Sequence, residues 1–168
     1  MDPEVAARLD ALGWDVENRA GYAEQYKDVI HEDSIKIGVS LKAPDYSFRI
    51  GGQRKFFLEA KKPSVSIKDD INPALQLRRY AWSAKLPLSI LTDFEELAVY
   101  DCRTKPNPKD KVSDGRVAYY TLDDYIEKFD EIYDTFSKES VLKGSFDRYI
   151  ESSKIKKVIG TSEIMEEE

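Results

Sequence analysis

The feature that most constrains this fold is residues 45–61, where apolar and polar side chains alternate on both sides of Gly51-Gly52-Gln53. Alternation with a period of two predicts β-strands. Glycines supply the positive φ values that hairpin turns require, and Pro44 biases its neighbour toward extended backbone. We therefore expect a β-hairpin with strands at residues 45–50 and 54–61.

The length of the connection sets the register of this hairpin. A three-residue connection pairs Ile50 with Arg54 and places Asp45 directly opposite Glu59. A two-residue turn would set Asp45 opposite Leu58 and mix charge into the apolar face, because a one-residue slip inverts every side chain. We therefore expect the odd-length connection. One face then carries Tyr46, Phe48, Ile50, Phe56, Leu58 and Ala60, and the other carries Asp45, Ser47, Arg49, Lys55, Phe57, Glu59 and Lys61.

Asp45, Glu59 and Lys61 are the residue types that magnesium-dependent hydrolysis of a phosphodiester requires. Directly opposed residues have Cβ atoms roughly 4.5–5.5 Å apart, and one or two carboxylates are enough protein ligation for Mg²⁺. Without a cation, two such carboxylates repel and one tends to protonate. We expect Asp45, Glu59 and the Ala60 carbonyl to bind the metal, and Lys61 to position or activate water. The alternative is a solvated charged face, since Glu-x-Lys is common on strands.

Two strings resemble the nuclease signature of the PD-(D/E)xK superfamily: residues 43–48, and residues 55–63 with Glu59-Ala60-Lys61 inside them. More narrowly, they resemble the N-terminal endonuclease domain of restriction-modification polypeptides, both the type I motor subunit and the single-chain type IIG enzymes. The similarity covers roughly residues 10 to 150. It includes a Gln-x-x-x-Tyr element from Gln76 to Tyr80 and the segment of residues 91–101 that follows it.

This resemblance implies a restriction-endonuclease-like α/β core, with a mixed central sheet of about five strands flanked by helices. It implies a Mg²⁺-dependent DNA endonuclease, with Mn²⁺ as a substitute, that cleaves double-stranded DNA and leaves a 5′-phosphate. Double-strand cleavage usually needs two active sites, so a second nuclease domain on the DNA is a further expected partner. By the resemblance, Asp45 and Glu59 are the metal ligands and Lys61 is the catalytic lysine; Gln76 and Tyr80 belong to the DNA-side helix, and Lys62 and Arg79 are further DNA-binding candidates.

In that family the nuclease is followed by a methyltransferase, a target-recognition domain or a helicase motor. The sequence has no Walker-type Gly-x-x-x-x-Gly-Lys run and no Asn-Pro-Pro-Tyr methyltransferase motif. We therefore expect a nuclease domain over residues 1–150, a charged linker or tail over 151–168 leading to such a domain, and no nucleotide cofactor. Two other functions stay open: a non-catalytic DNA-binding or assembly module on a nuclease fold, and a structure-specific repair nuclease.

The net charge of the chain and the distribution of its charged residues limit these expectations. The chain has 168 residues and a formal net charge of −6, which is unfavourable for DNA binding because phosphate neutralisation supplies most of that affinity. Basic residues nevertheless gather in and just after the hairpin, while acidic residues gather at the C-terminus. The basic set is Arg49, Arg54, Lys55, Lys61, Lys62, Lys68, Arg78, Arg79 and Lys85.

Single residues exclude several other classes. One cysteine, Cys102, cannot form an internal disulfide, which favours a reducing cytoplasm. His31 is the only histidine, so histidine-based triads and histidine-rich metal sites are excluded. The N-terminus opens no long apolar run, and we expect neither a secretory signal nor a membrane span. Glu32 has two interpretations: it is an extra metal ligand, or it is an exposed glutamate without that role.

Periodicity predicts the remaining elements. We expect helices over residues 3–12 and 21–32, a strand over 35–41, and a helix over 72–85 with Asn72 as its N-cap. Strands follow over 88–92, 97–100 and 116–120, with an unstructured loop over 102–115. A helix capped by Thr121 is expected to run to Phe136, and a last helix over 137–152.

Overall fold

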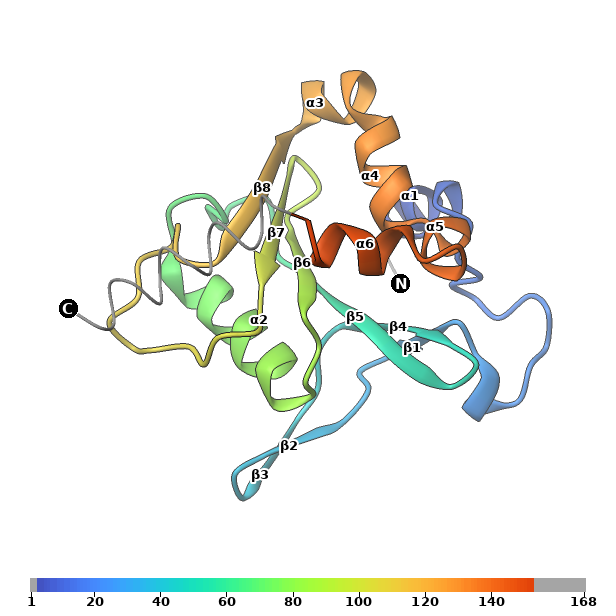
Figure 1. The fold of residues 1–168 in the computed structure, drawn as a ribbon, viewed down its shortest axis with the longest axis horizontal. Helices are drawn as coiled ribbons and strands as arrows, with labels where there is room; N and C mark the ends of the chain where they lie inside the picture. Colours follow the sequence, from blue (N-terminus) through green and yellow to red (C-terminus); the bar gives the residue numbers. More distant parts are fainter. Residues whose placement is uncertain (1–2, 153–168) are drawn as a thin grey trace.

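The computed structural model describes residues 3–152, with side chains from residue 7 onward. Its centre is a six-stranded mixed sheet in the order β1-β4-β5-β6-β7-β8, one strand more than expected (Figure 1). Neighbouring strands are antiparallel, except that β5 and β6 are parallel. The strands are β1 Val29–His31, β4 Tyr46–Ile50, β5 Gln53–Ala60, β6 Leu88–Thr92, β7 Glu96–Asp101 and β8 Arg116–Thr121.

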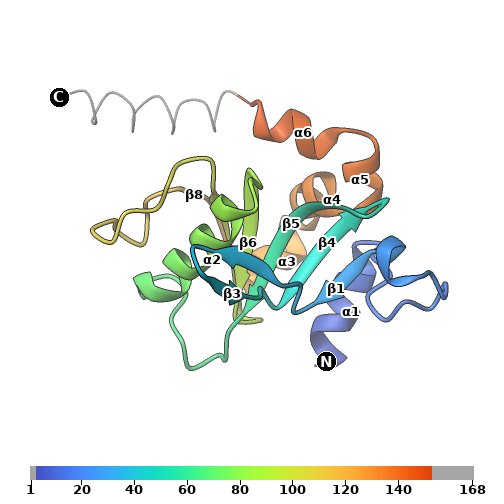
Figure 2. The ribbon, with the colours of Figure 1, turned by 90° about the horizontal axis from the view of Figure 1, so that it is seen from below.

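Helices cover both faces of this sheet, as Figures 1 and 2 show. Helix α2 (Ile71–Ser83) connects the parallel strands β5 and β6 and covers one face. The other face is covered by α1 (Pro3–Ala11), α4 (Phe129–Phe136), α5 (Lys138–Leu142) and α6 (Ser145–Ile150). Helix α3 (Leu122–Glu127) follows β8 directly. None of the helices in residues 3–152 is long and apolar enough to cross a membrane.

An aromatic core joins the sheet to the four-helix layer. Phe48 and Phe56 are paired across β4 and β5, and their rings stack with centroids 4.5 Å apart. Trp14 meets both rings edge-on, and its indole N–H donates to the carbonyl of Phe136 at 2.8 Å. These contacts bury the face of the hairpin that the sequence pattern assigned to the core.

The opposite face of the hairpin is also largely buried, so the alternative of a solvated charged face is wrong. Phe57 and Ser47 are fully buried beneath the layer that contains α2. The apolar residues Leu77 and Ala81 of α2 pack in the same cluster as Phe57, which explains the apolar residue in an otherwise polar series. The charged residues of this face therefore lie within a covered sheet, and their placement needs specific partners.

The hairpin turn differs from the prediction, yet the register at the far end agrees with it. Gly51 and Gly52 form a two-residue connection, and Ile50 pairs with Gln53 instead of Arg54. The register then shifts between Phe48 and Arg49, which leaves one extra residue on β5, so that Phe48 pairs with Phe56. This β-bulge restores the offset that a three-residue turn would have produced.

Two predicted elements before the hairpin are wrong. Residues 21–32 do not form a helix: Glu24–Tyr26 form a short 3₁₀ turn (η1), and Val29–His31 form the edge strand β1, paired with β4. Residues 35–41 do not form one strand, because the chain turns at Gly38 (φ +61°). Instead β2 (Ile35–Ile37) and β3 (Ser40–Lys42) form a separate hairpin.

The later elements agree more closely. Helix α2 is present, but Asp70 is its N-cap rather than Asn72, and the Asp70 side chain accepts from the Asn72 amide at 3.0 Å. Thr121 caps α3 through a capping box as predicted. The expected continuous helix breaks at Lys128, and the expected last helix is two short ones, α5 and α6. The predicted tail lies almost entirely outside the described residues.

The turn of the hairpin provides a first prediction. At Gly52 (φ +82°) an added Cβ would lie 2.7 Å from the carbonyl oxygen of Gln25, whereas at Gly51 (φ +57°) it would meet nothing within 4 Å. Gly52→Ala should lower the free energy of unfolding by about 3 kcal/mol, and Gly51→Ala by about 1 kcal/mol, because only the first adds a backbone clash to left-handed strain. Urea unfolding of both variants measures this; equal losses would contradict the described packing of the turn.

Candidate active site

Asp45 and Glu59 meet at the open end of the β4–β5 hairpin, as the register predicted. Tyr46 pairs with Leu58, so the next pair outward is Asp45 and Glu59. The Asp45 amide donates to Glu59 Oε1 at 2.8 Å, and the Ala60 amide donates to Asp45 Oδ2 at 2.8 Å. Each carboxylate is therefore fixed by a backbone N–H of the opposite strand, with Oδ1 of Asp45 and Oε2 of Glu59 as candidate metal ligands.

Lys61 joins this pair from the first position after β5. Its backbone amide donates to the carbonyl of Thr92 at 2.8 Å, which extends the pairing of β5 with β6 by one residue. Its Nζ lies 3.8 Å from Glu59 Oε2 and donates to Gln76 Oε1 at 2.8 Å. The ammonium group is thus held between a carboxylate of the sheet and an amide of the helix above it.

Gln76 and Tyr80 are four residues apart on α2 and form the far end of this chain of contacts. Gln76 Nε2 donates to the Tyr80 hydroxyl at 3.0 Å. Because an ammonium group can only donate, Gln76 must present its oxygen to Lys61 and its amide nitrogen to Tyr80. Burial raises the pKa of Tyr80, whose side chain is nearly covered, and the negative charges of Glu59 and Asp45 add to that rise.

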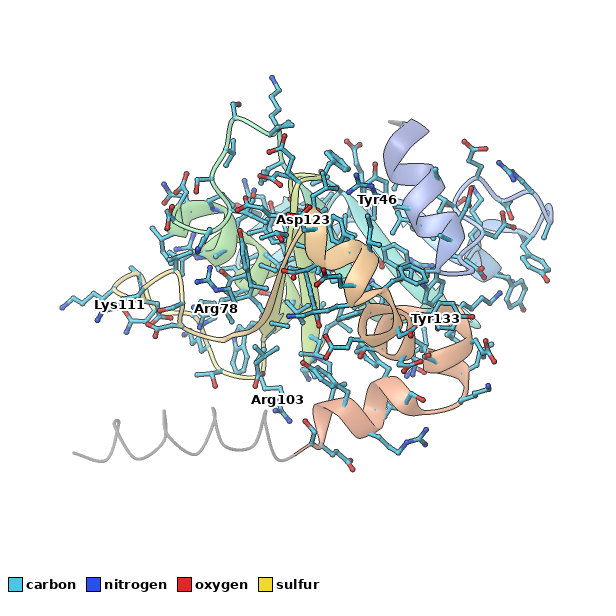
Figure 3. All side chains as sticks on the ribbon, turned by 90° about the horizontal axis from the view of Figure 1, so that it is seen from above. Tyr46, Arg78, Arg103, Lys111, Asp123 and Tyr133 are labelled. Atoms are coloured by element: carbon cyan, nitrogen blue, oxygen red, sulfur yellow. The ribbon has the colours of Figure 1, made fainter. Side chains whose placement is uncertain are left out.

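The other predicted DNA-binding residues lie apart from this chain of contacts. Lys62 and Arg79 are exposed, Lys62 at the cleft beside Lys61 and Arg79 on α2. Arg78 is buried instead and pairs with Asp110 at 2.8 Å, beneath the loop that also carries Lys111 (Figure 3). Arg78 therefore holds a loop in place and is not part of a basic DNA-binding surface. The DNA-contacting roles of Gln76, Tyr80, Lys62 and Arg79 stay predictions.

The electrostatics of the pair favour a bound cation. Glu59 is only 3% exposed. Burial, reinforced by the charge of Asp45, raises the pKa of Glu59 from 4.5 to about 7, although the Asp45 amide and Lys61 lower it in part. A carboxyl group with this pKa keeps much of its proton near neutral pH when no cation is present. A bound metal ion can displace that proton.

A cleft of about 620 Å³ opens over the candidate site. It is lined by Asp45, Tyr46, Ala60 and Lys61 from the hairpin; Figure 3 labels Tyr46. Arg8 of α1 also lines it, donating to the carbonyl of Phe94 and stacking on Tyr125. No sequence pattern pointed to Arg8, because α1 and the β6–β7 turn are brought together only by the fold. A separate apolar cavity of about 260 Å³ lies between α1 and α4, and no carboxylate lines it.

The donor set suits a magnesium ion rather than a closed structural metal centre. Within residues 3–152 no three His, Cys, Asp or Glu side chains are grouped to hold a metal. Two carboxylates and a main-chain carbonyl are sufficient for Mg²⁺, which keeps several waters and takes phosphate oxygens from its substrate. Glu32 is exposed, and its amide donates to the Asp45 carbonyl at 3.0 Å; a ligand role for its side chain stays a prediction.

The sequence of the chain is similar to sequences of known proteins. Residues 27–108, which contain the whole candidate site, match the family described as the N terminus of the type I restriction enzyme R protein. The chain is also 46% identical over 138 residues to the type II restriction enzyme and methyltransferase RM.Eco57I of Escherichia coli. The chain is related to the N-terminal domains of restriction enzymes. The predicted resemblance to restriction-modification polypeptides is thereby confirmed.

A solved structure supports the fold of this chain. The type IIG restriction endonuclease BpuSI matches 84% of the chain, with a TM-score of 0.50 and 19% sequence identity. That likeness confirms the predicted restriction-endonuclease-like α/β architecture. The match spans only 14% of RM.Eco57I and 16% of the BpuSI chain, so the similarity concerns a small part of each relative.

Proposed function

We propose that this chain is a Mg²⁺-dependent DNA endonuclease domain, the cleavage module of a restriction-modification enzyme. The observation that carries the proposal is the meeting of Asp45 and Glu59 with Lys61 Nζ 3.8 Å from Glu59 Oε2, where Asp45 and Lys61 line an open cleft. The relationship to restriction enzymes supports the same conclusion. The proposal includes double-stranded DNA as substrate and a reducing cytoplasm as compartment, the latter in keeping with the buried free thiol of Cys102.

In this proposal Asp45, Glu59 and the Ala60 carbonyl hold the magnesium ion. A bound divalent ion stabilises charge on the transferring phosphoryl group and acidifies a water ligand. The protein supplies rigidity: each carboxylate is already oriented by a backbone N–H, and Glu59 is buried, so little reorganisation accompanies binding. Mn²⁺, which takes similar oxygen ligands, is expected to substitute.

Lys61 is the residue that acts on the attacking water and the phosphate. Its ammonium group sits where it can hydrogen-bond to a water near Glu59 and offset charge that develops on the phosphate oxygens. Gln76 is a positioning residue. As a neutral acceptor it holds Nζ at 2.8 Å without cancelling the charge, and Tyr80 fixes the amide in that orientation.

Cleavage of both strands in this proposal uses two nuclease domains on one duplex, since each chain carries one such carboxylate pair. Lys62 and Arg79 are exposed and serve as phosphate contacts. Phosphate contacts of this kind fix orientation but carry no sequence information.

The test is cleavage of supercoiled plasmid by the chain in Mg²⁺, in Mn²⁺ and in a chelator. We expect nicked and linear products in either metal and none in the chelator, with ends that a ligase can rejoin because they retain a 5′-phosphate. DNA binding without cleavage at excess protein would identify a non-catalytic DNA-binding or assembly module. Cleavage restricted to branched or damaged DNA would identify a structure-specific nuclease instead.

A further inference from the structure

The β2–β3 hairpin is an excursion from the central sheet that the proposed chemistry does not use. β1 and β4 are antiparallel neighbours in which His31 pairs with Tyr46, so a short turn would suffice to join them. The chain instead leaves the sheet, forms β2 and β3, and returns at Asp45. The Glu32 amide donates to the Asp45 carbonyl at 3.0 Å, which ties the two ends of the excursion together beside the candidate site.

The base of this hairpin is firmly held. Asp33 accepts hydrogen bonds from Arg54 Nε at 2.7 Å and from Arg49 Nη2 at 3.1 Å, and both arginines lie on the catalytic hairpin. Ile35 is 5% exposed and packs in the same cluster as Phe57 and α2. The direction of the hairpin is therefore fixed relative to Asp45 and Glu59.

The end of the hairpin, in contrast, stands free of the body, as Figure 1 shows at the lower edge of the molecule. Val39 is 100% exposed and Leu41 is 73% exposed. Lys36 and Lys42 are exposed, and neither forms an ion pair within the part of the chain that the structure describes. Single exposed apolar residues need no explanation. The projecting β2–β3 hairpin, which carries two lysines and an apolar tip, does need one.

The positive charge of the β2–β3 hairpin indicates the kind of partner that it binds. Residues 34–44 contain two lysines and no acidic residue, in a chain whose net charge is −6. A local positive arm on an acidic protein suits a polyanion. Lys42 precedes Asp45 by three residues, hence by at most about 11 Å of extended chain, so a duplex bound at the cleft passes beside it.

We propose that the β2–β3 hairpin inserts into a groove of duplex DNA next to the scissile phosphate. A two-stranded β-ribbon fits a DNA groove. Lys36 and Lys42 contact the phosphates that border the groove, while Val39 and Leu41 contact base edges, where thymine methyl groups are apolar partners in the major groove. The inference rests on the proposed function, because it takes duplex DNA as the substrate.

The test compares duplex binding of the chain and its variants over a series of salt concentrations, with the metal chelated so that no cleavage takes place. Lys36→Ala/Lys42→Ala should weaken binding roughly tenfold and reduce the slope of log K against log salt by about 2, one for each lost phosphate contact. Val39→Ser/Leu41→Ser should weaken binding at every salt concentration without changing the slope. The matched control is Lys128→Ala/Lys143→Ala, which removes two exposed lysines that directly follow α3 and α5.

A cross-linking experiment tests the same contact directly. Cys102 is buried, and burial raises the pKa of its thiol, so a cysteine introduced at Val39 is the reactive one. A photo-cross-linker on Val39→Cys should attach to duplex DNA, whereas the same reagent on Leu142→Cys, an exposed position of α5, should not.

Unchanged affinity and salt slope in both hairpin variants, with no cross-link from position 39, would overturn the hairpin's role. If such variants instead lose a protein partner or self-association, the hairpin is a protein-docking arm. Plasmid cleavage is measured separately, so the nuclease proposal survives either outcome. If the wild-type chain neither binds nor cleaves duplex DNA, the nuclease proposal and this inference fail together.

Discussion

Replacing Lys61 by alanine should reduce the rate of Mg²⁺-dependent plasmid cleavage by about 10²–10³-fold or more, the usual loss when one charge-stabilising donor is removed from a transition state. The Lys61 ammonium lies 3.8 Å from Glu59 Oε2 and 2.8 Å from Gln76 Oε1, so it is held beside the carboxylate pair rather than free to bind DNA generally. Duplex affinity should therefore change little. Single-turnover cleavage and anisotropy measure the two quantities separately.

Two further variants sharpen this prediction. Gln76→Ala should give a smaller loss than Lys61→Ala, because it leaves the ammonium present but unpositioned, and Gln76→Asn should not rescue it, since the shorter side chain cannot span the same contacts. Lys143→Ala, at the residue that follows α5, removes an exposed lysine from the opposite layer and should cleave like the wild type. Full activity in Lys61→Ala would remove this lysine from the catalytic machinery.

Glu59→Gln should stabilise the metal-free chain at about pH 8 while abolishing cleavage. The pKa of Glu59 rises from 4.5 in an exposed setting to about 7 in the folded chain. Between these values the unfolded chain loses the proton and the folded chain keeps it, so stability falls as pH rises, by about 3 kcal/mol in total. The contribution is fully present below about pH 4.5 and is lost above about pH 7. The amide variant carries no such loss.

Urea unfolding in a chelator at about pH 5 and about pH 8 measures this effect. The free energy of unfolding of wild type minus that of Glu59→Gln should become more negative by about 2–3 kcal/mol from the lower to the higher pH. Mg²⁺ at the higher pH should restore stability to the wild type and not to the variant. Glu127→Gln, which removes an exposed carboxylate of α3, serves as control and should show no such dependence. A difference that does not change with pH would contradict the burial of a charged Glu59.

The meeting of Asp45 with Glu59 was more predictable than the turn that produces it, for a physical reason. The register that joins Asp45 to Glu59 agrees with the apolar face of Phe48, Phe56 and Leu58, because an offset by one residue would place charge in the aromatic core. The turn was not predictable: a two-residue glycine turn with a bulge yields the same offset as a three-residue turn. The hydrophobic pattern therefore predicts the strand pairing at the open end of the hairpin, but it does not predict the length or conformation of the turn.

One mispredicted segment, residues 21–32, owes its structure to a partner that is distant in the sequence. Tyr22, Tyr26, Val29 and Ile30 have helical spacing, yet both tyrosines are more than half exposed and Val29 and Ile30 are buried in an edge strand. Pairing with β4, which comes later in the sequence, makes residues 29–31 a strand. The contact of Lys61 with Gln76 could not be read from the sequence either, because it depends on how the crossover lays α2 across β5.

The location of a divalent ion tests the central claim most directly. Crystals of the chain soaked in Mn²⁺ should show an anomalous peak between Asp45 and Glu59, at about 2.0–2.3 Å from one oxygen of each carboxylate, and crystals of Glu59→Gln should lack it. This outcome does not depend on finding the right DNA. Manganese bound elsewhere and absent from this pair, or an equal peak in Glu59→Gln, would show that these carboxylates are not the metal site.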